Sequence, residues 1–346
     1  MNNPLLKLTE RYKKGNKPTF NFAPFLSITL MKEKRLEFNN ILQRAADMTQ
    51  ASLLNFDLGF ESITLPFDLN VEAEAIGAEV RYYEGYDDVP VYPTIVNKWV
   101  SSAQDIVIPE KIAEAGRVPV IVRCIKNVKE NASHIGAVGM FIPGPFTLAG
   151  QIMDMDELFV MTMKQPDIAE GIFAKLAEFI IELRDIYVDA GADFIDIEDG
   201  GATSISPSLF DTLLLPYLKK IFKHKVVPHT ISLTGKADRF MELLMECNPD
   251  GIGVDQESDI DQIRAVVPDQ LPIFAVCGDY AMLAKATPEE VIKTVQDMLD
   301  KGVTSVLPPS DIYPPARIEN IKAFIKAVKA YRPKTTHKNG AENKKN

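Results

Sequence analysis

Residues 192–201 read ADFIDIEDGG, and this stretch points to the fold class. It is a short apolar run that ends in acidic side chains, which is typical of a strand buried on both faces of a parallel sheet. Seven further runs have the same character. They are PTFNFAP near Phe20, SLLNFDL near Phe56, AVGMFIPG near Met140, KVVPHTI near Val227, GIGVDQ near Val254, PIFAVCG near Ala275 and TSVLPPS near Val306.

The segments between these runs show helical spacing. In PDIAEGIFAKLAEFIIELRDIYVDAG, Pro166 suits the first turn of a helix and Gly191 its end. In ATPEEVIKTVQDMLDKG, Thr287 and Glu290 predict a capping box. Eight strand–helix units in 346 residues predict an α/β fold, a single (β/α)8 TIM-type barrel over residues 1–331. A doubly wound open sheet is the alternative, but no glycine-rich turn follows an early strand.

Two regions depart from the strand–helix alternation. The stretch between the second and third predicted strands, about residues 72–120, contains VRYYEGYDDVPVYPTIV and predicts an inserted hairpin and loops at one end of the barrel. Residues 332–346, which include RPKTTHKNGAENKKN, are polar and without pattern. We expect them to form a mobile tail.

The composition excludes several classes of protein. With 46% hydrophobic residues the chain can bury a sizeable core, and with 38 Lys+Arg against 48 Asp+Glu its net charge is −10. That charge argues against sequence-independent binding of nucleic acid or anionic lipid. No run reaches the roughly 18 apolar residues of a membrane span, and no apolar run follows the first positive charges as in a secretory signal. Three cysteines fit a reducing, cytoplasmic location, and a homodimer stays open.

Polar residues that end predicted strands are the candidates for chemistry, because barrel enzymes carry their active sites at the carboxyl ends of the strands. Alternation places Asp196 and Glu198 on one face, where one of two buried carboxyls should titrate high. We expect Glu198, His229, Asp255 and Asp196 to be catalytic, His229 because it ends the run KVVPH. The alternatives are a His229 bonded to a neighbouring carbonyl and an Asp196 paired with a core Lys or Arg.

Further residues at the same end are expected to contact substrate. Thr147 begins a helix after PGP, where free N–H groups attract an anion. Cys277 follows a strand, but no histidine neighbours it in sequence to activate a thiol. The predicted substrate-binding residues are Asn21, Asp57, Thr147, Gln256, Cys277 and Ser310. No CxxC, HExxH or His-x-Cys spacing occurs, so no metal site is expected, and a mixed site of His229, Asp255 and Cys277 is the weaker alternative.

The sequence resembles a known superfamily. GMFIPGPFTLAGQIM resembles the G-x-x-GPFTLA segment of the uroporphyrinogen decarboxylase superfamily, and AGADFIDIEDGGATSISPSLFDTLLLPYLKKI resembles its fourth-strand region. LAKATPEEV and PPARIENIKAFIKAV are similar to its last two helices, so the resemblance covers about residues 51–328. Uroporphyrinogen decarboxylases hold a polycarboxylate with an Arg-rich N-terminal loop, whereas NFAPFLSITL has no arginine. The decarboxylase is therefore the alternative function.

The resemblance is stronger to the corrinoid-dependent methyltransferases, to which RVPVIVRCIKNVKE and EAEAIGAEV are similar. It implies a barrel mouth that docks a methylcobamide-carrying corrinoid protein and holds a small methyl acceptor. Thiol-methylating members bind zinc through a His-x-Cys pair and a later cysteine in a PGC turn. Here His229 matches the histidine, but Ile231 and Ser310 stand at the two cysteine positions, which argues against zinc.

Without zinc, the resemblance favours an acceptor that is nucleophilic when neutral. Tetrahydrofolate, through its N5 amine, is therefore favoured over a thiol. Two other roles stay open, namely a donor-side O- or N-demethylating corrinoid methyltransferase and a barrel that only binds the corrinoid protein. Carboxylates at four predicted strand ends favour an enzyme.

Overall fold

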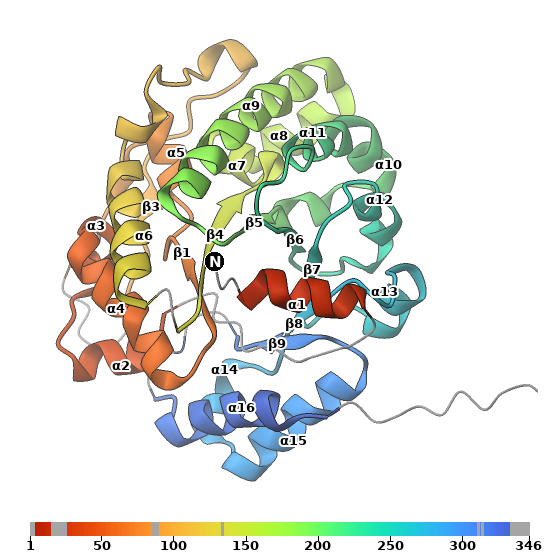
Figure 1. The fold of residues 1–346 in the computed structure, drawn as a ribbon. Coiled ribbons are helices and arrows are strands. Elements are labelled where there is room, and N and C mark those ends of the chain that lie inside the picture. The colour runs from red at the N-terminus through yellow and green to blue at the C-terminus, as the bar shows by residue number, and fades with distance from the viewer. Residues whose placement is uncertain are drawn as a thin grey trace, which may run out of the picture.

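The computed structural model describes residues 4–14, 26–84, 90–132, 135–309, 312 and 315–332. At its centre seven parallel strands form one curled sheet, and helices surround it (Figure 1). Sheet order follows chain order from edge to edge. The strands are β1 (Ser62–Leu65), β4 (Ala137–Pro143), β5 (Phe194–Glu198), β6 (His229–Leu233), β7 (Gly251–Val254), β8 (Ile273–Val276) and β9 (Ser305–Leu307).

The predicted α/β class with a parallel sheet is confirmed. The six predicted strands from Met140 onward overlap β4 to β9. The predicted strand near Phe20 lies outside the described residues, and β1 and β9 are the two edges of the described sheet. Closure into a complete (β/α)8 barrel therefore stays a prediction.

The predicted strand near Phe56 is wrong, because SLLNFDL belongs to helix α4 (Ala45–Leu58). Gly59 ends this helix with a left-handed φ of 105°. The strand that follows is β1, whose four residues are too few to show a period. The buried residues of α4 are Met48, Thr49, Ala51, Ser52, Leu54, Asn55, Phe56 and Leu58. Among them Met48, Ala51, Ser52, Asn55 and Leu58 recur at the three- and four-residue spacing of one helical face.

Helices fill the connections between the strands. The capping box of Thr287 and Glu290 and the helix between Pro166 and Gly191 are confirmed. The helices are α1 (Pro4–Lys13), α2 (Ile28–Glu33), α3 (Phe38–Gln43), α4, α5 (Val71–Ala75), α6 (Val118–Ala132), α7 (Pro145–Ile152), α8 (Met155–Lys164), α9 (Pro166–Ala190), α10 (Pro207–Leu209), α11 (Leu215–Ile221), α12 (Met241–Met245), α13 (Ile260–Val266), α14 (Tyr280–Lys285), α15 (Pro288–Asp300) and α16 (Ile318–Ala330).

The stretch between β1 and α6 contains more than one connecting helix. After α5, the short strands β2 (Val80–Arg81) and β3 (Thr94–Ile95) pair antiparallel. Two single-turn 3₁₀ helices follow before α6 begins. Of the predicted tail, residues 333–346 lie outside the described residues.

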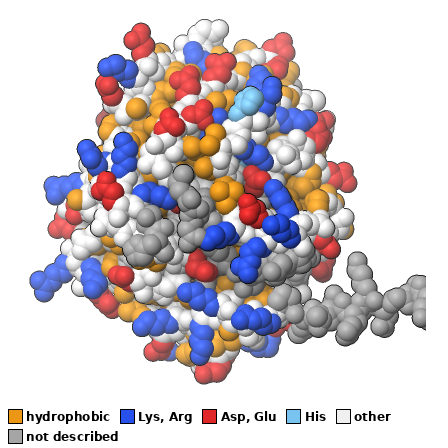
Figure 2. Space-filling view, in the orientation of Figure 1, with side chains coloured by type: hydrophobic (Ala, Val, Ile, Leu, Met, Phe, Trp, Pro, Cys, Tyr) orange, Lys and Arg blue, Asp and Glu red, His pale blue; other side chains and the backbone are white. Residues whose placement is uncertain are grey.

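Helix α1 closes the amino end of the sheet. Its Leu5 and Leu8 are buried against Ala137, Phe194 and Phe274, which lie at or near the first residues of their strands. Basic and acidic side chains both occur on this face (Figure 2). Because α1 covers the amino ends of the strands, a site at their carboxyl ends lies at the opposite end of the sheet from α1. None of the described helices combines the length and apolar character that a membrane crossing needs.

One carboxyl group in the helical layer is fully buried. Glu72 on α5 is 0% exposed, and among the described residues neither of its carboxylate oxygens has a hydrogen-bond partner. Burial raises the pKa of Glu72 to about 8. The group is therefore neutral through most of the physiological range.

Replacing Glu72 by Gln should change how stability depends on pH. In the folded chain the pKa of Glu72 lies above its ordinary 4.5, so the folded state binds more protons and the wild type loses stability as pH rises toward and through 8. We expect Glu72→Gln to be similar to wild type at pH 5.5 and roughly 3 kcal/mol more stable at pH 9. Urea unfolding at both pH values measures this, and an equal difference at both would contradict it.

Candidate active site

A cavity of about 500 Å³ lies where the strands of the sheet end. We call it the mouth cavity. Its volume is in the range of small-molecule sites, and its position is where parallel α/β enzymes bind substrate. Leu69, Phe141, Pro308 and Pro309 give it apolar walls. Its principal polar lining residues lie in or follow four different strands: Asp196, Glu198, Ser232, Thr234, Asp255 and Asp279.

Asp196 is held by hydroxyl groups of the neighbouring strand. Thr230 Oγ1 donates to its Oδ1 at 2.7 Å, and Ser232 Oγ donates to its Oδ2 at 2.8 Å. The Ser232 side chain has room only because residue 253 on the next strand is glycine, since a Cβ there would overlap Ser232 Oγ. Burial raises the pKa of Asp196, and the two hydroxyls partly offset this. The alternative of a Lys or Arg partner for Asp196 is not what the structure shows.

Glu198 lies at the end of β5, on the cavity side. Thr234 Oγ1 donates to its Oε1 at 2.7 Å. Gly200 makes this contact feasible, because a Cβ there would overlap both Thr234 Oγ1 and the Glu198 carboxylate. Burial raises the pKa of Glu198 to about 7; the Thr234 hydrogen bond lowers it and the charges of Asp199 and Asp196 raise it. A carboxyl group poised near neutrality both takes and gives a proton.

The anion at the start of α7 comes from the protein itself. The backbone N–H of Thr147 donates to Asp199 Oδ1 at 2.7 Å, and that of Phe146 donates more weakly to Oδ2 at 3.4 Å. Asp199 is fully buried, which raises its pKa to about 7 despite these hydrogen bonds. Thr147 is thus committed to Asp199 and does not line the mouth cavity. The predicted anion site exists, with a side chain as its anion.

Asp255 and Gln256 follow β7 and line the mouth cavity, as their positions predicted. The backbone N–H groups of Gly235 and Gln256 donate to the two oxygens of Asp255 at 3.2 and 2.6 Å. These bonds fix the carboxylate in the loop and connect the ends of β6 and β7. Gln256 itself is exposed.

The prediction that His229 ends a strand is wrong. Strand β6 begins at His229, and the preceding Val226 is 82% exposed in a loop. His229 therefore lies at the amino end of the sheet, away from the mouth cavity. Its Nδ1 is 2.8 Å from the carbonyl of Val227, and burial lowers its pKa to about 4. His229 therefore matches the alternative prediction of a histidine that is bonded to a nearby carbonyl.

Several predicted substrate-binding residues are placed elsewhere. Asp57 is exposed on helix α4 and not at a strand end. Cys277 follows β8 but faces α15, where its Sγ is 3.7 Å from the carbonyl of Thr294, and burial raises the pKa of its thiol to about 12. Asn21 and Ser310 lie outside the described residues.

Ser232 and Thr234 were missed by the sequence interpretation. They lie on the cavity side of β6 and its end, separated by one residue. The signal was present in HTISLT, where hydroxyl residues alternate with apolar ones, but the predicted strand ended at His229, where β6 begins, and this concealed it. Ser232 and Thr234 therefore face the cavity with the same i, i+2 spacing as a His-x-Cys pair. His229 and Ile231, which have this spacing too, do not line the cavity.

The described cavity residues do not fit a thiol-activating zinc. Their donors are carboxylate, hydroxyl and amide oxygens, whereas such a site uses thiolate and imidazole ligands. In the described ranges no group of three or more His, Cys, Asp or Glu side chains could hold a metal ion. The thiols of Cys124, Cys247 and Cys277 are buried elsewhere.

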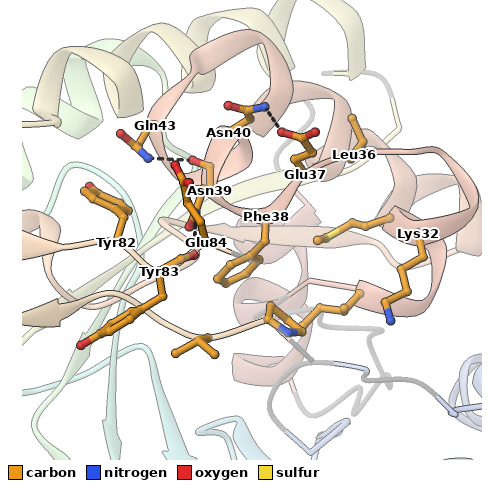
Figure 3. A pocket seen from close by; sticks show the side chains of 14 residues that line it. Lys32, Leu36, Glu37, Phe38, Asn39, Asn40, Gln43, Tyr82, Tyr83 and Glu84 are labelled. Carbon is orange, nitrogen blue, oxygen red and sulfur yellow. Dashed lines mark hydrogen bonds between the residues drawn. The ribbon is translucent and has the colours of Figure 1, made fainter. Parts of the chain in front are cut away.

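A second cavity, of about 880 Å³, lies between α2, α3 and the segment around β2 (Figure 3). Phe38, Tyr82 and Tyr83 line it together with the amides of Asn39 and Gln43. It is larger than the mouth cavity, but none of its lining residues belongs to the parallel sheet. We therefore place the chemistry in the mouth cavity.

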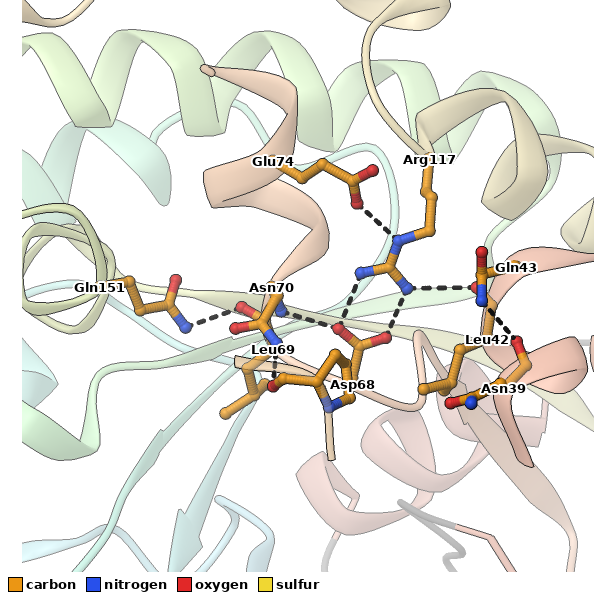
Figure 4. A network of polar contacts seen from close by, with 10 residues as sticks. Asn39, Leu42, Gln43, Asp68, Leu69, Asn70, Glu74, Arg117 and Gln151 are labelled. Atoms are coloured by element: carbon orange, nitrogen blue, oxygen red, sulfur yellow. Dashed lines mark hydrogen bonds and ion pairs between the residues drawn. The ribbon is translucent and has the colours of Figure 1, made fainter. Parts of the chain in front are cut away.

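A buried ion-pair network joins Arg117 to Asp68 and Glu74 (Figure 4). Arg117 donates to both oxygens of Asp68, at 2.6 and 2.9 Å, and its Nε donates to Glu74 at 2.6 Å. Leu69, the neighbour of Asp68, lines the mouth cavity, and Tyr82, whose ring centroid is 5.5 Å from the guanidinium, lines the other. The network fixes the loop after β1 against α5 and α6.

Comparison with known proteins places the chain in a family. The model of the uroporphyrinogen decarboxylase (URO-D) family matches residues 24–331. A solved methyltransferase from Methanosarcina mazei has the same fold, with a TM-score of 0.83 at 21% identity over 94% of this chain and 98% of that one. The methylcobamide:CoM methyltransferase MtbA of Methanosarcina acetivorans is 27% identical over 80% of this chain and 81% of its own. A uroporphyrinogen decarboxylase of Hydrogenovibrio crunogenus is 26% identical over 84% of each chain.

The chain belongs to the uroporphyrinogen decarboxylase family and fits its methylcobamide methyltransferase branch. The predicted family resemblance is thereby confirmed.

Proposed function

We propose that the chain is a methyltransferase that moves a methyl group between a methylcobamide, carried by a corrinoid protein, and a small molecule bound in the mouth cavity. The observation that carries this proposal is the mouth cavity with Glu198 at its wall, in a chain whose relatives include methylcobamide methyltransferases. The methylcobamide supplies an electrophilic methyl group. The chain supplies a walled site for the second substrate and a group that handles its proton.

Glu198 is the acid–base group of this proposal. With a pKa of about 7 it takes a proton from the nucleophile before methyl transfer and returns it in the reverse direction. Thr234 orients its carboxylate, since the hydrogen bond fixes Oε1 and leaves Oε2 for the substrate. Asp196 and Asp255 are anchored by hydroxyl and backbone donors. The charges of Asp199 and Asp196 raise the pKa of Glu198.

The identity of the small molecule is the finer part of the proposal. An amine nucleophile needs a proton acceptor and no metal, which keeps tetrahydrofolate as a candidate through its N5. The relatives give this preference no support, since MtbA is named a methylcobamide:CoM methyltransferase. Coenzyme M is therefore the competing acceptor.

The alternative is decarboxylation of uroporphyrinogen, which some relatives perform according to their names. A substrate with many carboxylates needs cationic partners. Among the described residues that line the mouth cavity, none is Lys, Arg or His. This lining favours methyl transfer over decarboxylation.

An absorbance assay distinguishes the two functions. Purified chain is mixed with methylcobalamin and with one acceptor at a time, which is dimethylamine, tetrahydrofolate or coenzyme M. The loss of methylcobalamin is followed by its absorbance. We expect acceptor-dependent loss that is absent without the chain. Release of CO₂ from uroporphyrinogen, with no loss of methylcobalamin under any condition, would establish the alternative.

A further inference from the structure

We propose that the small molecule that exchanges a methyl group in the mouth cavity is a cationic amine. This proposal rests on the proposed function and narrows its substrate class. Two features of the described lining carry it together: the sign of its charge and the apolar character of its remaining walls. The cavity at the strand ends is the binding site, and the carboxyl groups of its lining indicate the charge of the molecule that binds there.

The described lining contains four carboxyl groups and no Lys, Arg or His to balance their charge. Asp196, Glu198, Asp255 and Asp279 line the cavity, and in the described part of the chain none of the four forms an ion pair. Their partners are hydroxyl and backbone N–H groups, which are neutral. A bound cation would supply the missing charge, whereas a bound anion would add to the repulsion.

The other walls suit the alkyl groups of such a cation. Leu69, Phe141, Leu307 and Pro308 line the same cavity as the carboxylates. Methyl and methylene groups on nitrogen are accommodated by apolar surface, and an aromatic side chain adds favourable interaction with a cation. A volume of about 500 Å³ is ample for a small alkylamine.

The charge argument separates this class from the two other acceptors. Coenzyme M carries a sulfonate, and tetrahydrofolate carries the carboxylates of its glutamate. Neither anion finds a Lys, Arg or His among the described lining residues. An aliphatic amine is protonated at neutral pH and is attracted as the ammonium ion.

The chemistry balances with the groups present and the methylcobamide of the proposed function. A secondary ammonium ion transfers its N–H proton to the Glu198 carboxylate, which leaves a lone pair on nitrogen. The nitrogen lone pair forms the new N–C bond to the methyl group. At the same time the Co–C bond breaks, and the electron pair of the Co–C bond stays on cobalt as Co(I). The product is a methylated ammonium ion, and the reverse sequence uses such an ion as methyl donor.

Binding measurements test the charge preference without requiring turnover. Isothermal titration calorimetry at pH 7 compares tetramethylammonium with tert-butanol, an uncharged molecule of similar size, and with coenzyme M. We expect tetramethylammonium to bind roughly tenfold more tightly than either. We also expect its binding to release protons from Glu198, seen as a dependence of the measured heat on the ionisation enthalpy of the buffer. Equal affinities, or tighter binding of coenzyme M, would overturn the proposal.

Matched variants assign the effect to the cavity. Glu198→Gln should weaken tetramethylammonium binding roughly tenfold and abolish proton release. Glu257→Gln makes the same charge change on an exposed residue outside the cavity lining and should leave both unchanged. Asp255→Asn gives a second cavity variant, expected to weaken binding in the same direction; unchanged binding in both cavity variants would overturn the proposal.

The methylcobalamin assay keeps this proposal distinct from the proposed function. Turnover with dimethylamine, and not with coenzyme M or tetrahydrofolate, supports both. Turnover with coenzyme M or tetrahydrofolate, together with no binding of tetramethylammonium, overturns the cationic substrate and leaves methyl transfer standing. Selective binding of tetramethylammonium with no turnover under any condition supports the charge preference and contradicts methyl transfer.

Discussion

Replacing Glu198 by Gln is expected to lower the rate of methyl transfer at pH 7 by about 10²- to 10⁴-fold, the usual contribution of a general acid–base group. Glutamine keeps the shape of the side chain and can still accept the hydrogen bond from Thr234, but it cannot take a proton. The substitution should therefore lower kcat and leave the stability of the folded chain nearly unchanged. Rates are measured with methylcobalamin and the best acceptor, with Glu257→Gln as the matched control.

The pH profile separates a proton-transfer role from a merely structural one. If Glu198 is the base, the wild-type rate rises as pH increases through about 7, where the carboxylate becomes ionised. The residual rate of Glu198→Gln should not show this step. A variant with near-normal rates, or with the same pH profile as wild type, would reduce Glu198 to a structural residue.

Replacing Arg117 by Ala is expected to lower the free energy of unfolding by about 3–5 kcal/mol, because it leaves a buried carboxylate without its counter-charge. The Arg117 side chain is 6% exposed and Asp68 is 1% exposed, so water cannot replace the lost partner. Arg117 also donates to the carbonyl of Leu42 at 3.1 Å, and this contact with helix α3 is lost as well. Urea unfolding followed by circular dichroism measures the change.

An exposed ion pair of the same chain provides the comparison. Lys293 and Asp297 on α15 face solvent, with side chains 74% and 59% exposed. We expect Lys293→Ala to cost no more than about 0.5 kcal/mol. Similar costs for Arg117→Ala and Lys293→Ala would show that burial of the network contributes nothing.

The two central carboxylates were predictable from sequence because alternation in DFIDIED requires no knowledge of neighbouring strands. Asp196 and Glu198 both line the cavity, as the spacing of two residues required. Asp255 and Gln256 were placed correctly for another reason. They directly follow GIGV, a short strand with a clear end.

The errors arose where an apolar run and a strand do not coincide. In KVVPHTISL the strand begins at His229, and the apolar residues before it form a loop, so the histidine was assigned to the wrong end of the sheet. In SLLNFDL the apolar residues belong to a helix whose buried faces also happen to fit a strand. The hydrogen bonds of Thr234 and Ser232 depend on packing between strands that a single sequence does not display.

The fate of the methyl group tests the proposed methyl transfer most directly. The decisive measurement gives the chain methylcobalamin with a deuterium-labelled methyl group and dimethylamine, and analyses the products by mass spectrometry. We predict trimethylamine that carries the label, formed by the wild type and by Glu257→Gln and lost with Glu198→Gln. Recovery of unlabelled dimethylamine alone, with intact methylcobalamin and no label in tetrahydrofolate or coenzyme M offered in its place, would contradict the proposed methyl transfer.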